Sequence, residues 1–185
     1  MLFDLPKSLE VGGKRWPIRS DFRDVLTVVL AFEDPDLGQR EKAYVCLDII
    51  YPDFEDMPEK LYGEAFEAAI GFIDHGKKDG HPGPRTMDWE QDADLLFPAV
   101  NHVAGFEVRD VEYMHWWTFL GLFMEIGEGT YSTVLSLRQK KAKHKKLEKW
   151  ESEWWSNNIG ICKLKERYSE EELAEQARLK ALLGG

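Results

Sequence analysis

The sequence predicts a mostly α-helical fold, with about seven helices packed around a central Trp-rich helix and one small N-terminal β-hairpin. Apolar residues recur three, four and seven positions apart over most of the chain, which is the pattern of an amphipathic helix. Pro and Gly residues separate these stretches, and a Gly-Gly pair lies between two short potential strands. A length of 185 residues is typical of one domain. We therefore expect a single helical domain over residues 1–185, with an internal loop at about 76–87 and a basic C-terminal helical arm at about 138–185.

The hairpin is predicted around Gly12 and Gly13, because two successive glycines supply the positive φ angles that a two-residue turn requires. Pro17 cannot donate a backbone hydrogen bond, so its strand should lie at an edge. Two short strands are not stable alone, and we expect them to pack on the helices.

Three helices are expected after the hairpin. Ser20 is the expected N-cap of a helix that begins at Asp21 and ends before Pro35. A second helix should cover about 37–50, and a third should follow Pro58. The residues expected to point inward are Phe22, Val25, Leu26, Val29 and Leu30 in the first helix, Tyr44, Leu47 and Ile50 in the second, and Leu61, Ala65, Ala68, Ala69 and Phe72 in the third.

The middle of the chain begins with a surface loop, because residues 76–87 contain three Gly and two Pro. Asp88 is the expected cap of the next helix, which Gly105 should end. Another helix should start near Asp110. Eleven of its sixteen residues at 111–126 are apolar, so it should be buried in the centre of the fold.

The C-terminal third is predicted to hold the remaining helices. One should start near Thr130 and extend toward the charged segment 138–149, and residues 157–160 should form a turn. Ser169 followed by Glu172 is the pattern of a capping box, which should open the last helix.

Charge is distributed unevenly along the chain. The formal net charge is −10, but residues 1–137 carry 12 basic and 26 acidic residues, a net of −14, whereas residues 138–185 carry 12 and 8, a net of +4. An acidic body disfavours general coating of nucleic acid, because phosphate backbones require basic surfaces. No stretch is long and apolar enough to predict a membrane span or a signal peptide.

Common catalytic patterns are missing from the sequence. It has no GxxxxGK(S/T), GxGxxG, GxSxG, HExxH or CxxC pattern. Cys46 and Cys162 are expected to be small buried thiols. We therefore expect a protein that is not an enzyme and that has no cofactor.

Two acidic or His-containing segments leave a metal-dependent function open as an alternative. His75 and His81 lie near Asp74 and Asp79, but a Gly/Pro-rich loop gives metal ligands little rigid support, and solvated side chains are the expected state. The carboxylates at 88–94 lack the Gly and Glu of an EF-hand, and should form the acidic first turn of a helix.

The segment 138–149 contains seven Lys or Arg residues and one Glu, and three Trp residues follow at 150, 154 and 155. One interpretation is a solvated helix face whose Lys stems cover apolar surface. A second is a docking surface for an acidic or amphipathic helix, with Trp anchors. The third, nucleic-acid binding, is disfavoured by the acidic body. The candidate partner-binding residues are Arg138, Lys141, Lys145, Trp150 and Trp154.

His115 precedes Trp116 and Trp117 in the most apolar segment. A His in such a place can act as a catalytic base, but no nucleophile accompanies it. We expect a buried His that donates to a backbone carbonyl, and we expect both Trp residues to belong to the core.

Several segments together resemble a known family. These are residues 114–119 (Met-His-Trp-Trp-Thr-Phe), 127–130 (Gly-Glu-Gly-Thr), 135–138 (Leu-Ser-Leu-Arg) and the Asp-rich helix at 88–94 with Phe97. They are similar to the bacteriophage "gene product fifteen" family, which is encoded in the tail modules of long-tailed phages and prophages. The departures are Phe106-Glu107-Val108, Gly121 and the Gly/Pro-rich loop.

The resemblance implies a tail-assembly role, as a chaperone-like binder of the tape-measure protein. Self-association is left open by the charge division instead, because the basic arm can fold back on the acidic body of its own molecule, bind the body of a neighbour or bind another partner. The resemblance further implies a location in the cytoplasm of the host bacterium during phage assembly and absence from the mature virion. A structural tail or connector component of the virion is the alternative within the same resemblance.

Overall fold

The computed structural model describes residues 4–75 and 84–183, and in these residues nearly all regular structure is helical. The mostly α fold and the N-terminal hairpin are therefore confirmed, although the described part of the chain has nine α-helices rather than about seven. The elements are β1 (Ser8–Val11), β2 (Lys14–Pro17), α1 (Phe22–Glu33), α2 (Gln39–Ile50), two 3-10 turns, η1 (Phe54–Asp56) and η2 (Glu59–Leu61), α3 (Tyr62–Ile73), α4 (Ala93–Ala104), α5 (Trp116–Met124), α6 (Thr130–Ala142), α7 (Lys149–Asn157), α8 (Ile159–Cys162) and α9 (Glu170–Leu183).

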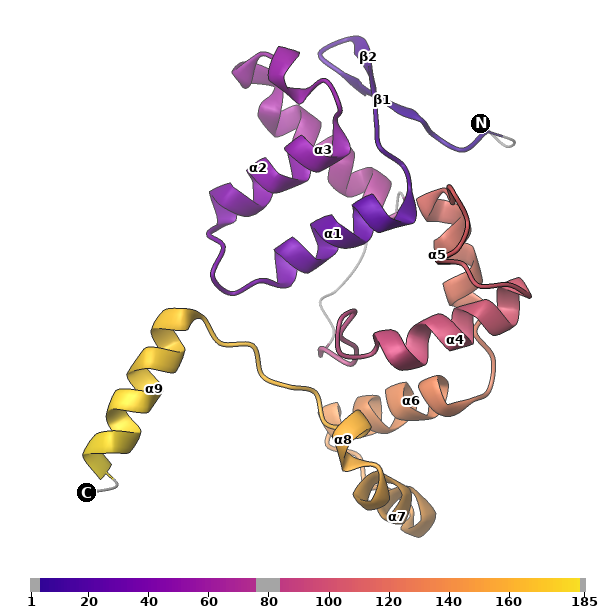
Figure 1. Cartoon of the computed structure of the whole chain (residues 1–185), viewed down its shortest axis with the longest axis vertical. Helices are drawn as coiled ribbons and strands as arrows, with labels where there is room; N and C mark the ends of the chain where they lie inside the picture. The colour runs from indigo at the N-terminus through magenta and orange to yellow at the C-terminus, as the bar shows by residue number, and fades with distance from the viewer. Residues whose placement is uncertain (1–3, 76–83, 184–185) are drawn as a thin grey trace.

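The helices form two groups that α5 joins (Figure 1). The hairpin and α1 to α3 make the first group, and α4 with α6 to α8 makes the second. Helix α5 packs on α1 at one side and on α4 at the other. Helix α9 leads away from both groups.

The hairpin has the predicted turn. Gly12 and Gly13 have φ angles of 59° and 73°, and the strands pair antiparallel with Leu9 opposite Trp16. Trp16 and Val11 are buried, and the backbone N–H of Gly12 donates to the Glu64 carboxylate of α3 at 2.8 Å. The hairpin therefore packs on the helices, as its short strands require.

The first three helices cover nearly the predicted ranges, with two corrections. The N-cap of α1 is Asp21, whose carboxylate accepts from the Arg23 N–H, while Ser20 is buried and hydrogen-bonds the Tyr113 hydroxyl. Tyr44 was expected to point inward, but it is 58% exposed. The buried face of α2 is centred on Cys46, Leu47 and Ile50, and Tyr44 falls beyond its edge.

The predicted helix from Asp110 begins only at Trp116, because the preceding backbone bonds to another segment. Phe22 N–H donates to the Met114 carbonyl, and Trp116 N–H donates to the Ser20 carbonyl. Asp21 also accepts from the Met114 N–H. These long-range bonds hold the residues before α5 in an extended conformation against the start of α1.

Helix α4 also starts later than predicted. Asp88 accepts from the backbone N–H groups of Glu90 and Gln91, so it closes a turn, and the helix begins at Ala93. Gly105 ends α4 with a φ of 78°, as predicted.

The basic segment is divided between two helices rather than forming one arm. Helix α6 ends at Ala142 and α7 begins at Lys149. The turn expected at 157–160 is replaced in part by α8, a single helical turn. The capping box is present: Ser169 N–H donates to the Glu172 carboxylate, and Glu172 N–H donates to the Ser169 hydroxyl.

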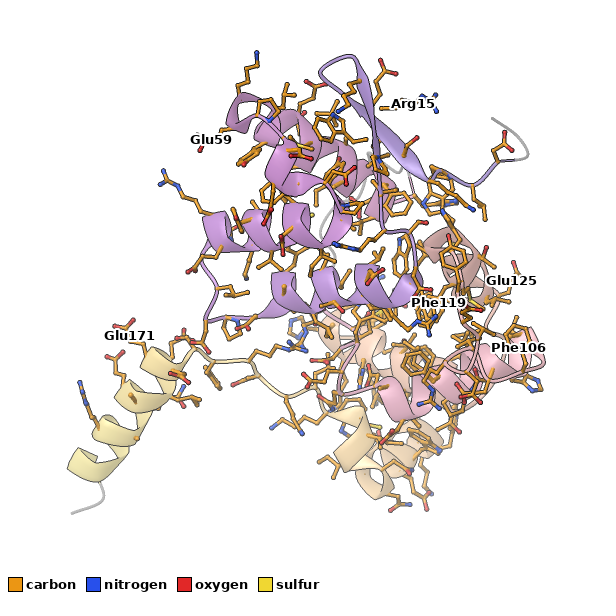
Figure 2. The ribbon with its side chains drawn as sticks, turned by 45° about the horizontal axis from the view of Figure 1, so that its top comes forward. Arg15, Glu59, Phe106, Phe119, Glu125 and Glu171 are labelled. Carbon is orange, nitrogen blue, oxygen red and sulfur yellow. The ribbon has the colours of Figure 1, made fainter. Side chains whose placement is uncertain are left out.

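One main core joins the two groups of helices. Phe22 of α1 and Phe119 of α5 are both fully buried and stack with ring centroids 4.5 Å apart. Figure 2 shows Phe119 among packed side chains, whereas Glu171 of α9 points away from the body. Cys46 and Cys162 are buried free thiols, as expected. Among the described residues, no helix has the length and apolarity to cross a membrane.

Candidate partner-binding surface

Arg138 does not belong to a partner-binding surface, which corrects the prediction. It is only 4% exposed, and its guanidinium forms a bidentate pair with Asp92 at 2.6 and 2.8 Å. The remaining hydrogen bonds go to the backbone carbonyls of Thr86, Ile161 and Cys162. Every N–H of the guanidinium is thus used inside the molecule.

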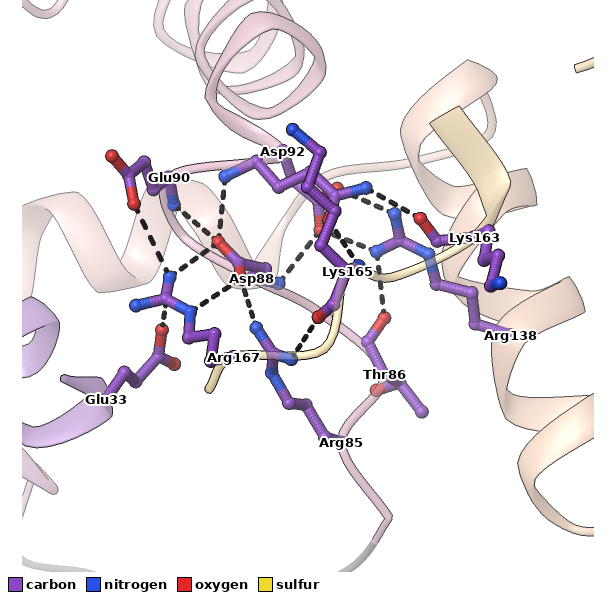
Figure 3. A network of polar contacts seen from close by, with 11 residues as sticks. Glu33, Arg85, Thr86, Asp88, Glu90, Asp92, Arg138, Lys163, Lys165 and Arg167 are labelled. Atoms are coloured by element: carbon purple, nitrogen blue, oxygen red, sulfur yellow. Dashed lines mark hydrogen bonds and ion pairs between the residues drawn. The ribbon is translucent and has the colours of Figure 1, made fainter. Parts of the chain in front are cut away.

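Asp88 is the centre of a second set of ion pairs beside the first (Figure 3). It is 2% exposed, pairs with Arg85, and accepts from Arg167 at 2.9 and 3.1 Å. Burial alone would raise the pKa of Asp88, but the hydrogen bonds from Arg167 and from the Gln91 N–H hold the pKa below its usual value. Asp88 is therefore held as a carboxylate.

The side chains of Arg85, Asp88 and Gln91 bind an extended segment, residues 163–168, which we call the strap. The Gln91 amide donates to the Lys163 carbonyl at 2.8 Å and accepts from the Lys165 N–H at 2.9 Å. Arg85 donates to the Lys165 carbonyl at 3.0 Å. The carboxylates and amide at 88–92 therefore fix the C-terminal third of the chain to the body.

The sequence analysis missed this role, because it treated residues 88–94 as the acidic first turn of a helix. Asp88, Gln91 and Asp92 have the spacing of one face of a helical turn, which was the available signal. Their partners lie 46 to 79 positions later in the chain, and local sequence does not identify them. The segment 84–87 is likewise part of the network, because Arg85 and Thr86 contact the strap and Arg138.

Lys140 is the second cation of the basic segment that is used internally. It pairs with Glu151, which is 3% exposed, and so joins the end of α6 to the start of α7. Glu151 also accepts from the Glu148 N–H and completes a capping box of α7.

Five lysines of the segment remain exposed and make no ion pair with a described residue: Lys141, Lys143, Lys145, Lys146 and Lys149. Lys141 lies over the Trp155 ring, 4.2 Å from its centroid, which is a cation–π contact. Of the seven cations in the segment, five lysines therefore carry its exposed positive charge, and Arg138 and Lys140 form ion pairs inside the molecule.

Two Trp residues accompany these lysines on α7. Trp150 is 55% exposed and its indole N–H donates to Glu148 at 2.9 Å. Trp154 is half-buried and lies one helical turn later, on the same face. We call Trp150, Trp154 and the five exposed lysines the basic Trp surface.

His115 and the two Trp residues after it lie inside the fold. The Nδ1 atom of His115 accepts from the Trp117 N–H at 3.0 Å, so the Nε2–H donates to the Pro6 carbonyl at 2.9 Å. Burial lowers the pKa of His115 and favours the neutral ring. Trp116 is 2% exposed and Trp117 is half-buried, and their indoles donate to the carbonyls of Ile73 and Phe72.

The metal alternative gains no support from the described residues. They contain no group of three His, Cys, Asp or Glu side chains that could hold an ion. His75 packs edge-on against Trp117 with centroids 4.5 Å apart. His81 and Asp79 lie outside the described residues.

The sequence model of the family described as "Bacteriophage Gp15 protein" matches residues 2–169. The chain belongs to this family. The match includes the hairpin, all helices from α1 to α8, the strap network and the basic Trp surface, and it ends one residue before α9. Neither a curated protein nor a solved structure matches the chain. Membership in the Gp15 family establishes a bacteriophage protein.

Proposed function

We propose that this protein acts in phage tail assembly as a non-enzymatic, chaperone-like binder of the tape-measure protein. The observation that carries the proposal is the basic Trp surface, which combines exposed lysines with an exposed Trp on a chain of the bacteriophage Gp15 family. Large exposed aromatic side chains in a charged surround are typical of protein–protein contact sites.

The surface suits an amphipathic helix with acidic residues. Trp150 and Trp154 are four positions apart, so their rings can follow an apolar stripe of a partner helix. The lysines attract carboxylates beside that stripe and accelerate encounter. A tape-measure protein, as a long helical chain, exposes such stripes until tail-tube subunits surround it.

Ion pairs inside the molecule hold α6 and α7, the helices at the two ends of the basic segment, in place. Lys140 with Glu151 joins α6 to α7, and Arg138 with Asp92 fixes α6 to the start of α4. A rigid surface loses less conformational entropy on binding. Because much of the contact would be solvated and charged, binding can still be weak enough for the chaperone to release its partner during assembly.

Co-expression with the tape-measure protein of the same phage tests the proposal. We expect the wild-type chain to co-purify with the tape-measure protein and to raise its soluble yield, and we expect Trp150→Ala combined with Lys145→Glu to lose both effects. Phe106→Ala is the matched control, because Phe106 is 48% exposed and lies outside the basic Trp surface. Wild-type protein that neither co-purifies nor raises the yield would refute the proposal.

Mass spectrometry of purified virions separates the chaperone from a structural tail component. A chaperone of the host cytoplasm should be absent from the particles, whereas a tail or connector protein should be present in fixed proportion to the other tail proteins.

A further inference from the structure

Helix α9 buries none of its described side chains, and only Leu173 at its start lines a hollow with the body, beside Leu30 and Pro35. Residues 170–178 are all exposed, and the helix leads away from the rest of the molecule (Figure 1). An isolated helix of 14 residues is marginally stable in water, because most helical stability in proteins comes from packing. A partner surface would supply that packing.

The start of α9 is fixed to the body. The Glu170 N–H donates to the Asp36 carboxylate at 2.7 Å, and Arg167 pairs with Asp88 and Glu33 just before the helix. From this point α9 points away from α7 (Figure 1). While these contacts hold, α9 does not reach the basic Trp surface of its own molecule.

The charges of α9 complement the basic Trp surface. The first turns of α9 carry four glutamates, at 170, 171, 172 and 175, and one apolar side chain, Leu173, which is 52% exposed. Glu171 and Glu175 are two positions from Leu173, so they lie on a different face of the helix. The basic Trp surface presents five exposed lysines and the exposed Trp150. An acidic helix is therefore available on one molecule, and a basic surface with an aromatic anchor on the next.

We propose that α9 of one molecule docks on the basic Trp surface of a second copy. The contact uses different surfaces of the two copies, so it is head-to-tail and leads to rings or open chains. Opposite charges hold it, so it weakens as salt rises. The family match covers the basic Trp surface but ends before α9, so family membership alone does not imply the contact.

The inference goes beyond the chaperone proposal and does not depend on it, because self-association needs no tape-measure protein. If both are correct, the second copy and the tape-measure protein compete for one surface.

Sedimentation equilibrium of the full chain at low salt tests the inference with two double variants. Lys145→Glu with Lys149→Glu reverses charge on the basic Trp surface. Glu171→Lys with Glu175→Lys reverses charge on one face of α9 and leaves the Ser169–Glu172 capping box intact. We expect the wild-type average mass to rise above 21.5 kDa with concentration and to fall back in high salt. Each double variant alone should stay at 21.5 kDa.

A one-to-one mixture of the two double variants decides the geometry. Each variant retains the surface that the other lacks, so a head-to-tail contact predicts that the mixture associates and reaches at least the mass of a heterodimer, twice 21.5 kDa, although each variant alone stays monomeric. Glu59→Lys and Lys60→Glu are matched controls on exposed residues of η2, and should associate like the wild type. A monomeric wild type, or a mixture that stays monomeric while both variants keep wild-type circular dichroism, would overturn the inference.

Discussion

Removal of the Arg138 side chain is expected to destabilise the fold strongly. Its guanidinium compensates the buried Asp92 carboxylate and three buried or half-buried carbonyls. Arg138→Met should lower the free energy of unfolding by about 3–5 kcal/mol, because it leaves Asp92 charged and unpaired. Urea denaturation measures this loss.

A second substitution separates the charge effect from packing. Asp92→Asn added to Arg138→Met should restore part of the stability, because a neutral amide oxygen can still accept from the Asp88 N–H. Lys145→Met is the exposed control and should change stability by roughly 0.5 kcal/mol or less. An Arg138→Met variant as stable as Lys145→Met would contradict the buried ion pair.

His115 should make stability depend on pH. Burial lowers its pKa below the ordinary value of 6.5, so the unfolded chain binds a proton at a higher pH than the folded chain does. The free energy of unfolding should therefore fall as the pH drops below 6.5, until the pH passes the pKa of the folded state.

Urea denaturation over roughly pH 7.5 to 5 measures the dependence on His115. His115→Gln should be less stable at neutral pH and should lose this part of the slope. His102→Gln, on an exposed His of α4, should keep the wild-type slope. If the free energy of unfolding of His115→Gln depended on pH as in the wild type, another titratable group would be responsible for that dependence.

At the scale of the helices and the strap, the Gln91 amide is expected to control local opening. It makes two hydrogen bonds to the strap backbone, each worth about 1 kcal/mol. Gln91→Ala should therefore speed hydrogen exchange at the Lys165 amide by roughly fivefold or more, while exchange in α1 to α3 stays as in the wild type. Gln139→Ala, on an exposed Gln of α6, should leave the strap unchanged. Equal exchange at Lys165 in both variants would show that Gln91 does not hold the strap.

The same scale shows why helix starts were harder to predict than helix faces. Apolar spacing located α1, α3 and α6, because their buried sides depend on local periodicity. The starts of α4 and α5 were placed too early. Asp88 and Gln91 bind the strap and Asp92 binds Arg138, while residues 114–116 bind residues 20–22 at the start of α1. Those hydrogen bonds join distant parts of the chain, and nothing in the local pattern encodes them.

At the scale of the whole molecule, the sequence predicts the acidic body and the basic C-terminal part, but it does not predict which cations form internal ion pairs and which stay exposed. The sequence placed a net charge of +4 after residue 137, but it did not show that Arg138 and Lys140 are paired internally. Only a fold that places Asp92 and Glu151 beside them makes this distinction. The candidate partner-binding surface therefore excludes Arg138 and consists of the exposed lysines at 141–149 with Trp150 and Trp154.

The joint between the two groups of helices decides whether the chain unfolds as one domain. Phe119 is fully buried, stacks on Phe22 of the first group, and contacts Phe97 of α4 in the second. Hydrogen exchange followed by mass spectrometry during thermal unfolding should give one midpoint for α2 and α6 in the wild type, because both groups share this core.

Phe119→Ala tests that coupling. It should lower the free energy of unfolding by about 3–5 kcal/mol and should separate the two midpoints, since α5 then loses its main contact with α1. Phe106→Ala removes an exposed ring and should leave the midpoints together. Two midpoints in the wild type itself would show that the hairpin with α1 to α3 and the helices from α4 onward are separate folding units, and that the single-domain prediction is wrong.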